Sequence, residues 1–432
     1  MKTKDEIIDL IEEEGVEFIR LQFTDIFGNL KNLAVTPSQM ERVLNNKYSF
    51  EAADVFGNAF DPEEDLYLYP DLDTFVILPW RPQQGKVGKI LCDVRLADGK
   101  DFEMDSRAIL KNVLKKAADM GYTFYVDPEC EFFLFHTDEN GNPTNQTHEK
   151  AGYMDVGPID FGENARRDMV LTLEEMGFEV ESSHHEKAPA QHEIDFKEAE
   201  ALQIADSITT FKFAVRSIAK RFGLYATFMP KPKTDYAGSG MHLNVSLYKD
   251  DKNVFRDSGA EDNISETAKY FMGGIMAHAR ALCAITNPIV NSYKRILTGF
   301  EAPSDITWTT RGENALLKVK NSFDDMKVEL RFPDASANPY LALAVCLAAG
   351  IDGIEQKINP GENSAGIKKP TNAVKLPDNL KEAVVAMKND AFMEQILGKQ
   401  FVQSYTDYKL KEWNDYMMQV SDWEVNKYLY RM

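Results

Sequence analysis

The chain has 432 residues, and 69 Asp and Glu against 49 Lys and Arg give it a formal charge of −20 at pH 7. No dense cluster of Lys and Arg is present, which argues against a partner that is gripped through its phosphates, such as nucleic acid or an anionic membrane surface. At roughly 150 residues per domain the length predicts two or three domains, and 44% apolar residues suffice for large cores.

The first residues lack the apolar segment of a signal peptide, and the longest run of apolar or small residues, Tyr340 to Ile351, is too short to span a bilayer. We therefore expect a soluble, cytoplasmic protein.

The N-terminal part is predicted to be a small, strand-rich domain over residues 1–100. An amphipathic pattern over 5–14 favours a short helix. Apolar or alternating runs separated by turn signals favour strands at 18–23, 33–35, 74–78 and 89–93.

The remainder, residues 101–432, is predicted to be a larger domain of mixed helices and strands, so that the fold class is α+β. Helical periodicity is expected at 106–120, 165–176, 203–222, 265–286, 337–358 and in the tail from Leu380. Strands are expected at 122–135, 178–183, 191–196, 224–228 and 241–248. The segment 359–377, rich in Pro, Gly and Lys, is expected to be a surface loop.

Two glutamates stand at alternate positions of the predicted strand 122–135. Because side chains two apart on a strand face the same way, Glu129 and Glu131 project together while Cys130 and Phe132 point into the core. Two adjacent negative charges are costly unless a cation lies between them.

Three further segments carry similar chemistry. Around a turn containing Pro189, Glu186 and Glu193 can close on one point, although the neighbouring histidines lack the zinc-protease spacing. The strand after Gly238-Ser239-Gly240 has His242, Asn244 and Ser246 on one face. In 327–334, Glu329 shares a strand face with Arg331, whose guanidinium suits a carboxylate or phosphate.

Taken together, these segments supply five glutamates and one histidine on strand faces. Such a set suits hard divalent cations, Mg²⁺ or Mn²⁺, that bridge the phosphates of ATP. Because the chain has no phosphate-binding P-loop and no dinucleotide-binding glycine motif, metals and arginines would have to hold the nucleotide.

The order of these motifs resembles bacterial type I glutamine synthetase over nearly the full length. The resemblance is carried by 67–71, 128–133, 184–186, 228–232, 238–242, 291–295, 301–303 and 338–342. It implies an N-terminal β-grasp domain, a catalytic domain with a curved antiparallel sheet, and a dodecamer of two stacked hexameric rings. The implied reaction phosphorylates the γ-carboxylate of glutamate with ATP, after which ammonia attacks the acyl phosphate.

The resemblance also implies roles for individual residues. A first metal set comprises Glu131, Glu186 and Glu193, and a second metal set comprises Glu129, His242 and Glu329. Arg295 and Arg331 would grip the substrate carboxylate and the transferred phosphoryl group. Gly238 would offer its backbone to the substrate amino group, and Glu301 in a flap would shield the intermediate and accept a proton. Ser246 and Phe228 would lie on the adenine side.

The sequence departs from the family pattern at three segments that would contact the reacting groups. The ammonium pocket reads Phe50-Glu51-Ala52-Ala53-Asp54, so that Glu51 and Asp54 carry its charge. Glu313 stands where the family has an arginine that stabilises the phosphoryl group, and Arg-Ile-Pro has become Lys318-Val319-Lys320. Arg311 could substitute for the missing arginine, and Lys318 remains on the nucleotide side. Ala237 replaces an asparagine before the Gly-Ser-Gly segment.

Three functions stay open on this evidence. The chain could be a glutamate–ammonia ligase with an unusual pocket. It could instead join glutamate to an amine other than ammonia, as the altered ammonium pocket suggests. Because Glu313 replaces the arginine that stabilises the phosphoryl group, the chain could also be a sensor of nucleotide or amino acid with little catalytic activity.

Overall fold

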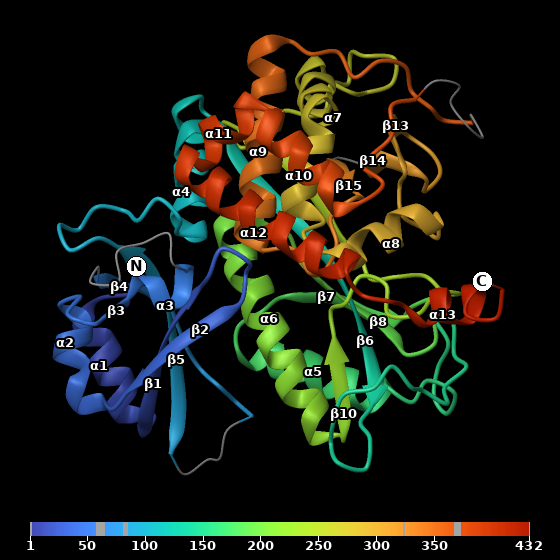
Figure 1. Cartoon of the computed structure of the whole chain (residues 1–432). Helices are drawn as coiled ribbons and strands as arrows, with labels where there is room; N and C mark the ends of the chain where they lie inside the picture. Colours follow the sequence, from blue (N-terminus) through green and yellow to red (C-terminus); the bar gives the residue numbers. More distant parts are fainter. Residues whose placement is uncertain (1, 58–64, 81–84, 323–324, 367–372, 432) are drawn as a thin grey trace.

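The computed structural model describes residues 2–57, 65–80, 85–322, 325–366 and 373–431. Two sheets organise them (Figure 1). The N-terminal sheet has the order β2-β1-β5-β4-β3. Its strands are β1 (Val16–Thr24), β2 (Leu30–Val35), β3 (Ser49–Glu51), β4 (Asp65–Ile77) and β5 (Lys86–Arg95).

Short helices accompany this first sheet. They are α1 (Lys4–Glu13), the 3-10 turn Pro37–Gln39, α2 (Met40–Leu44) and α3 (Ala52–Phe56). Helix α1 begins where the sequence predicts, because Thr3 and Glu6 cap each other's backbone amides, and it buries Ile7 and Ile11.

The second sheet follows the path β13-β14-β15-β11-β6-β8-β7, with β9 and β10 paired to β6 and β12 paired to β11. Its strands are β6 (Thr123–His136), β7 (Val180–His185), β8 (Gln191–Phe196), β9 (Ala199–Glu200), β10 (Leu224–Thr227), β11 (Met241–Lys249), β12 (Lys252–Asn253), β13 (Asp305–Thr309), β14 (Ala315–Ser322) and β15 (Asp325–Leu330). Its pairings among the described residues are antiparallel, as the family resemblance implies, and β13 adds to β14 in parallel at one edge.

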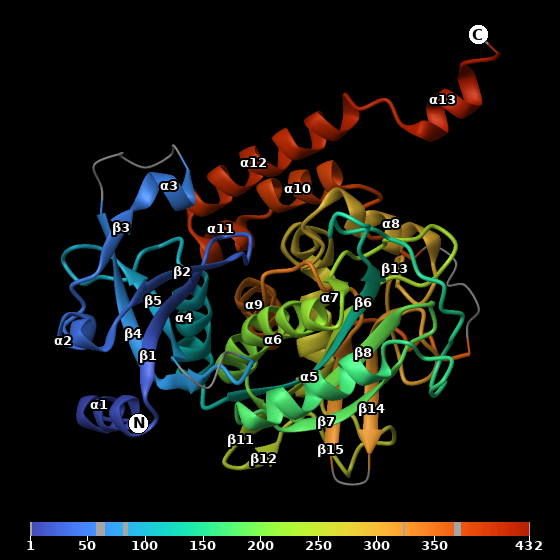
Figure 2. The ribbon, with the colours of Figure 1, turned by 90° about the horizontal axis from the view of Figure 1, so that it is seen from below.

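Helices alternate with the strands of this sheet along the chain (Figure 2). They are α4 (Ser106–Asp119), α5 (Glu163–Glu175), α6 (Ala201–Arg221), α7 (Glu266–Thr286), α8 (Val290–Thr298), α9 (Pro339–Gln356), α10 (Leu380–Asn389), α11 (Ala391–Leu397), α12 (Lys399–Met417) and α13 (Asp422–Tyr428). Helix α13 projects away from the body of the molecule and ends at the C-terminus.

Helix α9 is buried along nearly its whole length. Asn338 caps its first amides and Pro339 occupies its first turn, where no amide hydrogen is needed. A side chain at Gly274 or Gly353 would lie about 2 Å from a carbonyl oxygen of the opposing helix. The two glycines therefore let α7 and α9 pack backbone to backbone.

The two sheets are joined through a buried arginine. Arg107 at the start of α4 donates to Asp71 and Asp93 of the first sheet, at 2.7 and 2.6 Å, and to Asp206 of α6 at 2.9 Å. This network fixes the orientation of the small sheet against the helices of the large one.

Most predicted elements are present within a few residues, but six of the described strands differ from expectation. Strands β3, β9, β12, β13 and β14 have no counterpart in the prediction, and β4 begins nine residues before the expected start at 74. The early part of β4 contains Pro70, Asp71 and Asp73, which disfavour a strand, and a register shift separates it from the apolar part.

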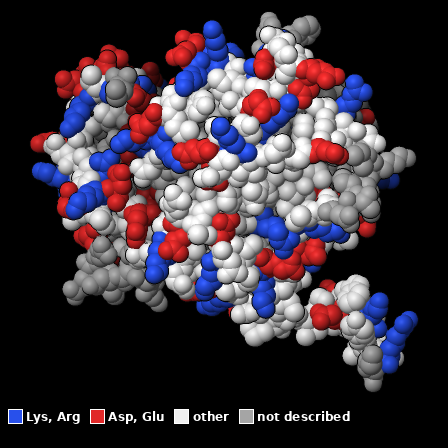
Figure 3. Space-filling view, turned by 90° about the horizontal axis from the view of Figure 1, so that it is seen from above, with Lys and Arg blue, Asp and Glu red and all other residues white. Residues whose placement is uncertain are grey.

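No helix among the described residues is long and apolar enough to cross a membrane. On the face in Figure 3, acidic and basic side chains are interspersed. The expected loop 359–377 includes residues 367–372, which lie outside the described residues. Residues 359–366 there contact β13, and Gly361 accepts a hydrogen bond from the Trp308 indole at 3.0 Å.

Candidate active site

The register of the second sheet brings the predicted metal-binding side chains together. Strand β6 lies between β11 and β8, so that Glu129 faces His242 and Glu131 faces Glu193. On the other side of β11, Asn244 faces Glu329 of β15. Directly opposed side chains on one face lie within contact distance. Cys130 and Phe132 are buried in the core, as the alternation predicts.

The second metal set forms a compact group. One ligand atom from each of Glu129, His242 and Glu329 lies within 4.8 Å of the others. The Nδ1 atom of His242 lies 3.1 Å from Glu129 Oε2 and 3.5 Å from Glu329 Oε1. Glu329 is 1% exposed, and its Oε2 has no hydrogen-bond partner among the described residues. A buried carboxylate oxygen without a donor fits a bound cation.

The first metal set is less tightly gathered. Among the described residues, Glu131, Glu186 and Glu193 do not form such a group; instead Glu193 groups with His184 and Asp195. Glu131 accepts from Gln191 at 2.7 Å and from the Gly240 amide at 3.0 Å. Glu186 accepts from His184 at 2.9 Å and from the Lys187 amide at 3.0 Å, so these two carboxylates have donors within the chain.

The pKa values in the first metal set show how crowded its negative charge is. Burial and the neighbouring Glu131 and Asp195 carboxylates raise the pKa of Glu193 to about 12. Burial and Glu186 likewise raise the pKa of Glu131, although His242 and Arg295 oppose the shift. The carboxylates cannot all ionise as they stand, and a divalent cation would remove that obstacle. The residues of both sets therefore fit hard divalent cations.

Two lysines that sequence reasoning left out of the metal chemistry lie beside the second metal set. Lys320 Nζ lies 2.7 Å from Glu129 Oε1 and 3.7 Å from Glu329 Oε2. Lys318, predicted for the nucleotide side, lies 3.9 Å from the same Glu329 oxygen. Burial disfavours the charged form of Lys320, but Glu129 and Glu329 outweigh it and raise its pKa. Burial also opposes ionisation of Glu129, yet His242 and Lys320 lower its pKa.

Both predicted arginines are buried at the same site. Arg295, 2% exposed on α8, donates to the carbonyl oxygens of Arg331 and Phe332, each at 3.1 Å. Burial lowers its pKa although Glu131 opposes that shift. Arg331 contacts Glu329 through Nη1 and donates to the Glu313 carbonyl at 3.0 Å. Two guanidiniums thus flank the carboxylates, where they could hold an anionic substrate.

The glycine segment before β11 permits close approach of the backbone. A Cβ on Gly240 would lie 2.8 Å from Arg295 Nη2 and 2.9 Å from His242 Nε2. The carbonyl of Gly238 faces the site and accepts from Gln191 Nε2 at 3.1 Å. Gln191, missed in the sequence, therefore connects the Gly238 backbone to Glu131.

The predicted flap residue Glu301 reaches the site through an ion pair with Lys187, the neighbour of Glu186. Glu301 adopts a left-handed backbone with φ 58°, which is costly for a residue with a side chain. Glu313 lies 3.8 Å from the same ammonium. The acid that replaces the family arginine thus faces the flap.

Three predicted residues are not joined to this group. Arg311 is exposed, and no hydrogen bond or ion pair of its side chain to the other candidates is found among the described residues. Glu51 and Asp54 are also exposed, at the end of β3 and on α3 of the first sheet. Within the single chain they contribute nothing to the site.

Phe228 and Ser246, both predicted for the adenine side, lie beside different parts of β6. Ser246 lies opposite Tyr125 on β6, whereas Thr227, before Phe228, lies opposite Phe133, eight residues further along. At about 3.3 Å per residue this is a separation of roughly 26 Å. Phe228 packs in the core against Phe132.

Ser246 instead has a charged neighbour that sequence reasoning missed. Its hydroxyl donates to Glu198 at 3.2 Å, and Glu198 pairs with Lys327 at 3.1 Å.

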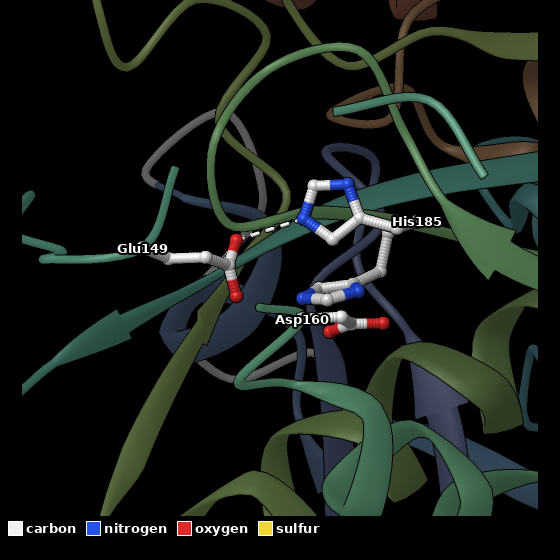
Figure 4. A group of neighbouring side chains, drawn as sticks. Glu149, Asp160 and His185 are labelled. Atoms are coloured by element: carbon white, nitrogen blue, oxygen red, sulfur yellow. Dashed lines mark hydrogen bonds and ion pairs between the residues drawn. The ribbon is translucent and has the colours of Figure 1, made fainter. Parts of the chain in front are cut away.

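Behind the first metal set lies a buried polar network (Figure 4). Glu149 accepts from His185 Nε2 at 2.7 Å, and the other ring nitrogen of His185 donates to the Glu186 carbonyl at 2.6 Å. Asp160 pairs with Arg166 at 2.8 Å, and the same arginine nitrogen lies 2.7 Å from His192. Since a guanidinium already supplies positive charge there, the network supports the β7–β8 hairpin rather than a further cation.

A curved sheet that brings carboxylates, a histidine and arginines together beside a small strand-rich domain is typical of metal-dependent enzymes of phosphoryl transfer. Comparison with known families makes the assignment specific. The model described as "Glutamine synthetase, beta-Grasp domain" matches residues 15–97, and that described as "Glutamine synthetase, catalytic domain" matches residues 103–428. The chain belongs to the glutamine synthetase family.

Relatives match over nearly the full length. A glutamine synthetase of Clostridium saccharobutylicum is 50% identical over 436 residues, covering 99% of this chain and 98% of the relative. One from Staphylococcus aureus (strain MW2) is 46% identical over 437 residues with the same coverage. Among solved structures, apo GmaS without ligand has a TM-score of 0.89 and 31% identity, covering 98% of this chain and 99% of that one. The β-grasp and catalytic folds are thereby confirmed.

Proposed function

We propose that the chain is an ATP-dependent ligase that forms glutamine from glutamate and ammonia through γ-glutamyl phosphate. The observation that carries the proposal is the group of Glu129, His242 and Glu329 beside two buried arginines. The full-length relatives named glutamine synthetase support the same reaction.

In the proposed reaction, a γ-carboxylate oxygen of glutamate attacks the γ-phosphorus of ATP, and ADP leaves. Arg295 and Arg331 hold the anionic groups, while Lys318 balances charge on the phosphates. Mg²⁺ or Mn²⁺ in the two metal sets would supply Lewis acidity for the phosphoryl oxygens. We place the nucleotide on the side of Ser246.

Ammonia then attacks the acyl carbon, the adduct loses a proton, and phosphate leaves with the electrons of the C–O bond. Glu301 is the proposed acceptor of that proton. Since Lys187 pairs with Glu301, the flap has to exchange this contact when the intermediate forms. Closing the flap would exclude water, which competes with ammonia for the acyl phosphate.

We further propose that the chain divides near residue 100 and assembles in the cytoplasm as a dodecamer of two hexameric rings. The exposed apolar side chains Trp423 and Val425 on the projecting α13, and Leu429 directly after it, support assembly with other copies. Glu51 and Asp54 would then form the ammonium pocket of a neighbouring copy.

A second candidate is a ligase for an amine other than ammonia, favoured by the altered charges at Glu51 and Asp54. Phosphate release from ATP, with glutamate and Mg²⁺, separates the candidates. We expect release with ammonium that exceeds release with any amine in a panel. Release with an amine alone would establish the second candidate, and no release with any acceptor would favour a sensor.

A further inference from the structure

The side chain of Lys320 lies between two carboxylates of the second metal set. Strand β14 pairs with β15 so that Lys318 faces Glu329 and Lys320 faces Lys327, one step further along the same face. From there the Lys320 ammonium reaches Glu129 Oε1 at 2.7 Å and comes within 3.7 Å of Glu329 Oε2. The two acids belong to different strands, and the lysine connects them.

The surroundings of this ammonium are those of a bound cation. Glu129 Oε1 also accepts from the Asn244 amide at 3.0 Å, and His242 contacts both carboxylates from the other side. Within the described part of the chain Glu329 Oε2 makes no hydrogen bond, yet the ammonium groups of Lys320 and Lys318 lie 3.7 and 3.9 Å away. The same oxygens that would ligate a divalent cation are therefore already neutralised by the chain.

An ammonium and a divalent cation cannot use these oxygens together. Both need Glu129 Oε1 or Glu329 Oε2 at close range, and in a poorly hydrated site two cations a few ångströms apart repel strongly. A lysine has a long flexible stem, so its ammonium can leave when another cation or an anion competes for it. Lys320 is about one-third exposed, which leaves room for that movement.

We infer that Lys320 is a tethered cation that competes with divalent metal for the second metal set and, when metal enters, turns toward the nucleotide phosphates. The inference rests on the proposed function. It predicts that this chain binds a divalent cation at the second metal set more weakly than it would without Lys320.

Binding of Mn²⁺ to the full chain, followed by electron paramagnetic resonance of free Mn²⁺, tests the inference without any turnover. The variants are Lys320→Met and Lys320→Gln, the latter retaining a polar side chain. Lys249→Met is the matched control, because it removes the same charge from an exposed end of β11. Thermal unfolding verifies that each variant is folded.

We expect the weaker class of Mn²⁺ sites to tighten about tenfold or more in both Lys320 variants, from loss of a competing charge. The control should stay within twofold of the wild type. Unchanged or weaker binding in folded Lys320 variants would overturn the inference while leaving the proposed function intact. A wild type and variants that bind no Mn²⁺ at all would overturn the proposed metal sets and the inference together.

Discussion

Replacing Glu329 by Gln removes one negative charge from the second metal set while nearly preserving its shape. The side chain is 1% exposed and contacts Arg331, and its Oε2 lies 3.7 Å from the Lys320 ammonium. At an effective dielectric constant of about 20, two unit charges about 4 Å apart interact by about 4 kcal/mol. Removing one partner of a buried pair costs about 3–5 kcal/mol, because the other charge stays buried. We therefore expect the free energy of unfolding to fall by about 3 kcal/mol.

The same substitution should weaken Mn²⁺ binding at the second metal set. Mutation of a residue that only orients a metal ligand lowers the affinity for the metal about 10–100-fold. Removal of a ligand itself should therefore lower the Mn²⁺ affinity at least about 100-fold. Titration with Mn²⁺ and urea unfolding measure the two effects. Asp325→Asn is the control, since Asp325 begins the same strand and is 39% exposed. Second-set affinity within twofold of the wild type in the folded Glu329 variant would refute the assignment.

Two further predictions concern the scaffold. Glu149 accepts from His185 and the Ala190 backbone through Oε1 and from the Phe161 backbone through Oε2. Glu149→Gln leaves only one acceptor oxygen for these donors and removes the charge that faces His185, so it should disturb the hairpin before Glu193 and raise the KM for Mn²⁺ about 10–100-fold with little change in circular dichroism. An unchanged KM would show that the network does not position the ligands. Burial alone would lower the pKa of His278, but the carboxylates of Asp390 and Asp352 have the larger effect, and the pKa is raised. The charged His278 therefore stabilises the folded protein at pH values below the unfolded-state pKa of histidine. This stabilisation is lost as the pH rises through the folded-state pKa. His278→Gln should therefore lower the melting temperature more at about pH 5.5 than at about pH 9, and an equal loss at both values would contradict the charged pair.

The carboxylates were predictable because strand geometry alone decides which side chains share a face. Alternation placed Glu129 and Glu131 together and sent Cys130 into the core, with no knowledge of neighbouring strands. The family resemblance then supplied the partners His242 and Glu329. The structure adds the cross-strand register, which explains how residues more than 100 positions apart meet.

Cross-strand and loop contacts could not be predicted, because they depend on which distant segments pair and not on the local alternation of residues. Lys320 reaches Glu129 because residues 315–322 form strand β14, which the sequence analysis did not predict. Glu149 lies in a long segment between β6 and α5, with no periodicity to indicate its contact with His185. Phe228 directly follows β10, which pairs with the end of β6 away from Ser246, and that pairing too depends on long-range contacts.

The central claim is that this chain joins ammonia to the γ-carboxylate of glutamate at the expense of ATP. Purified full-length chain can be incubated with glutamate, ATP, Mg²⁺ and ¹⁵N-ammonium, and the product followed by nuclear magnetic resonance while phosphate is measured in parallel. The account predicts glutamine labelled in the side-chain amide, with one phosphate released per glutamine. Phosphate release without labelled glutamine, or no release by the folded protein, would contradict it.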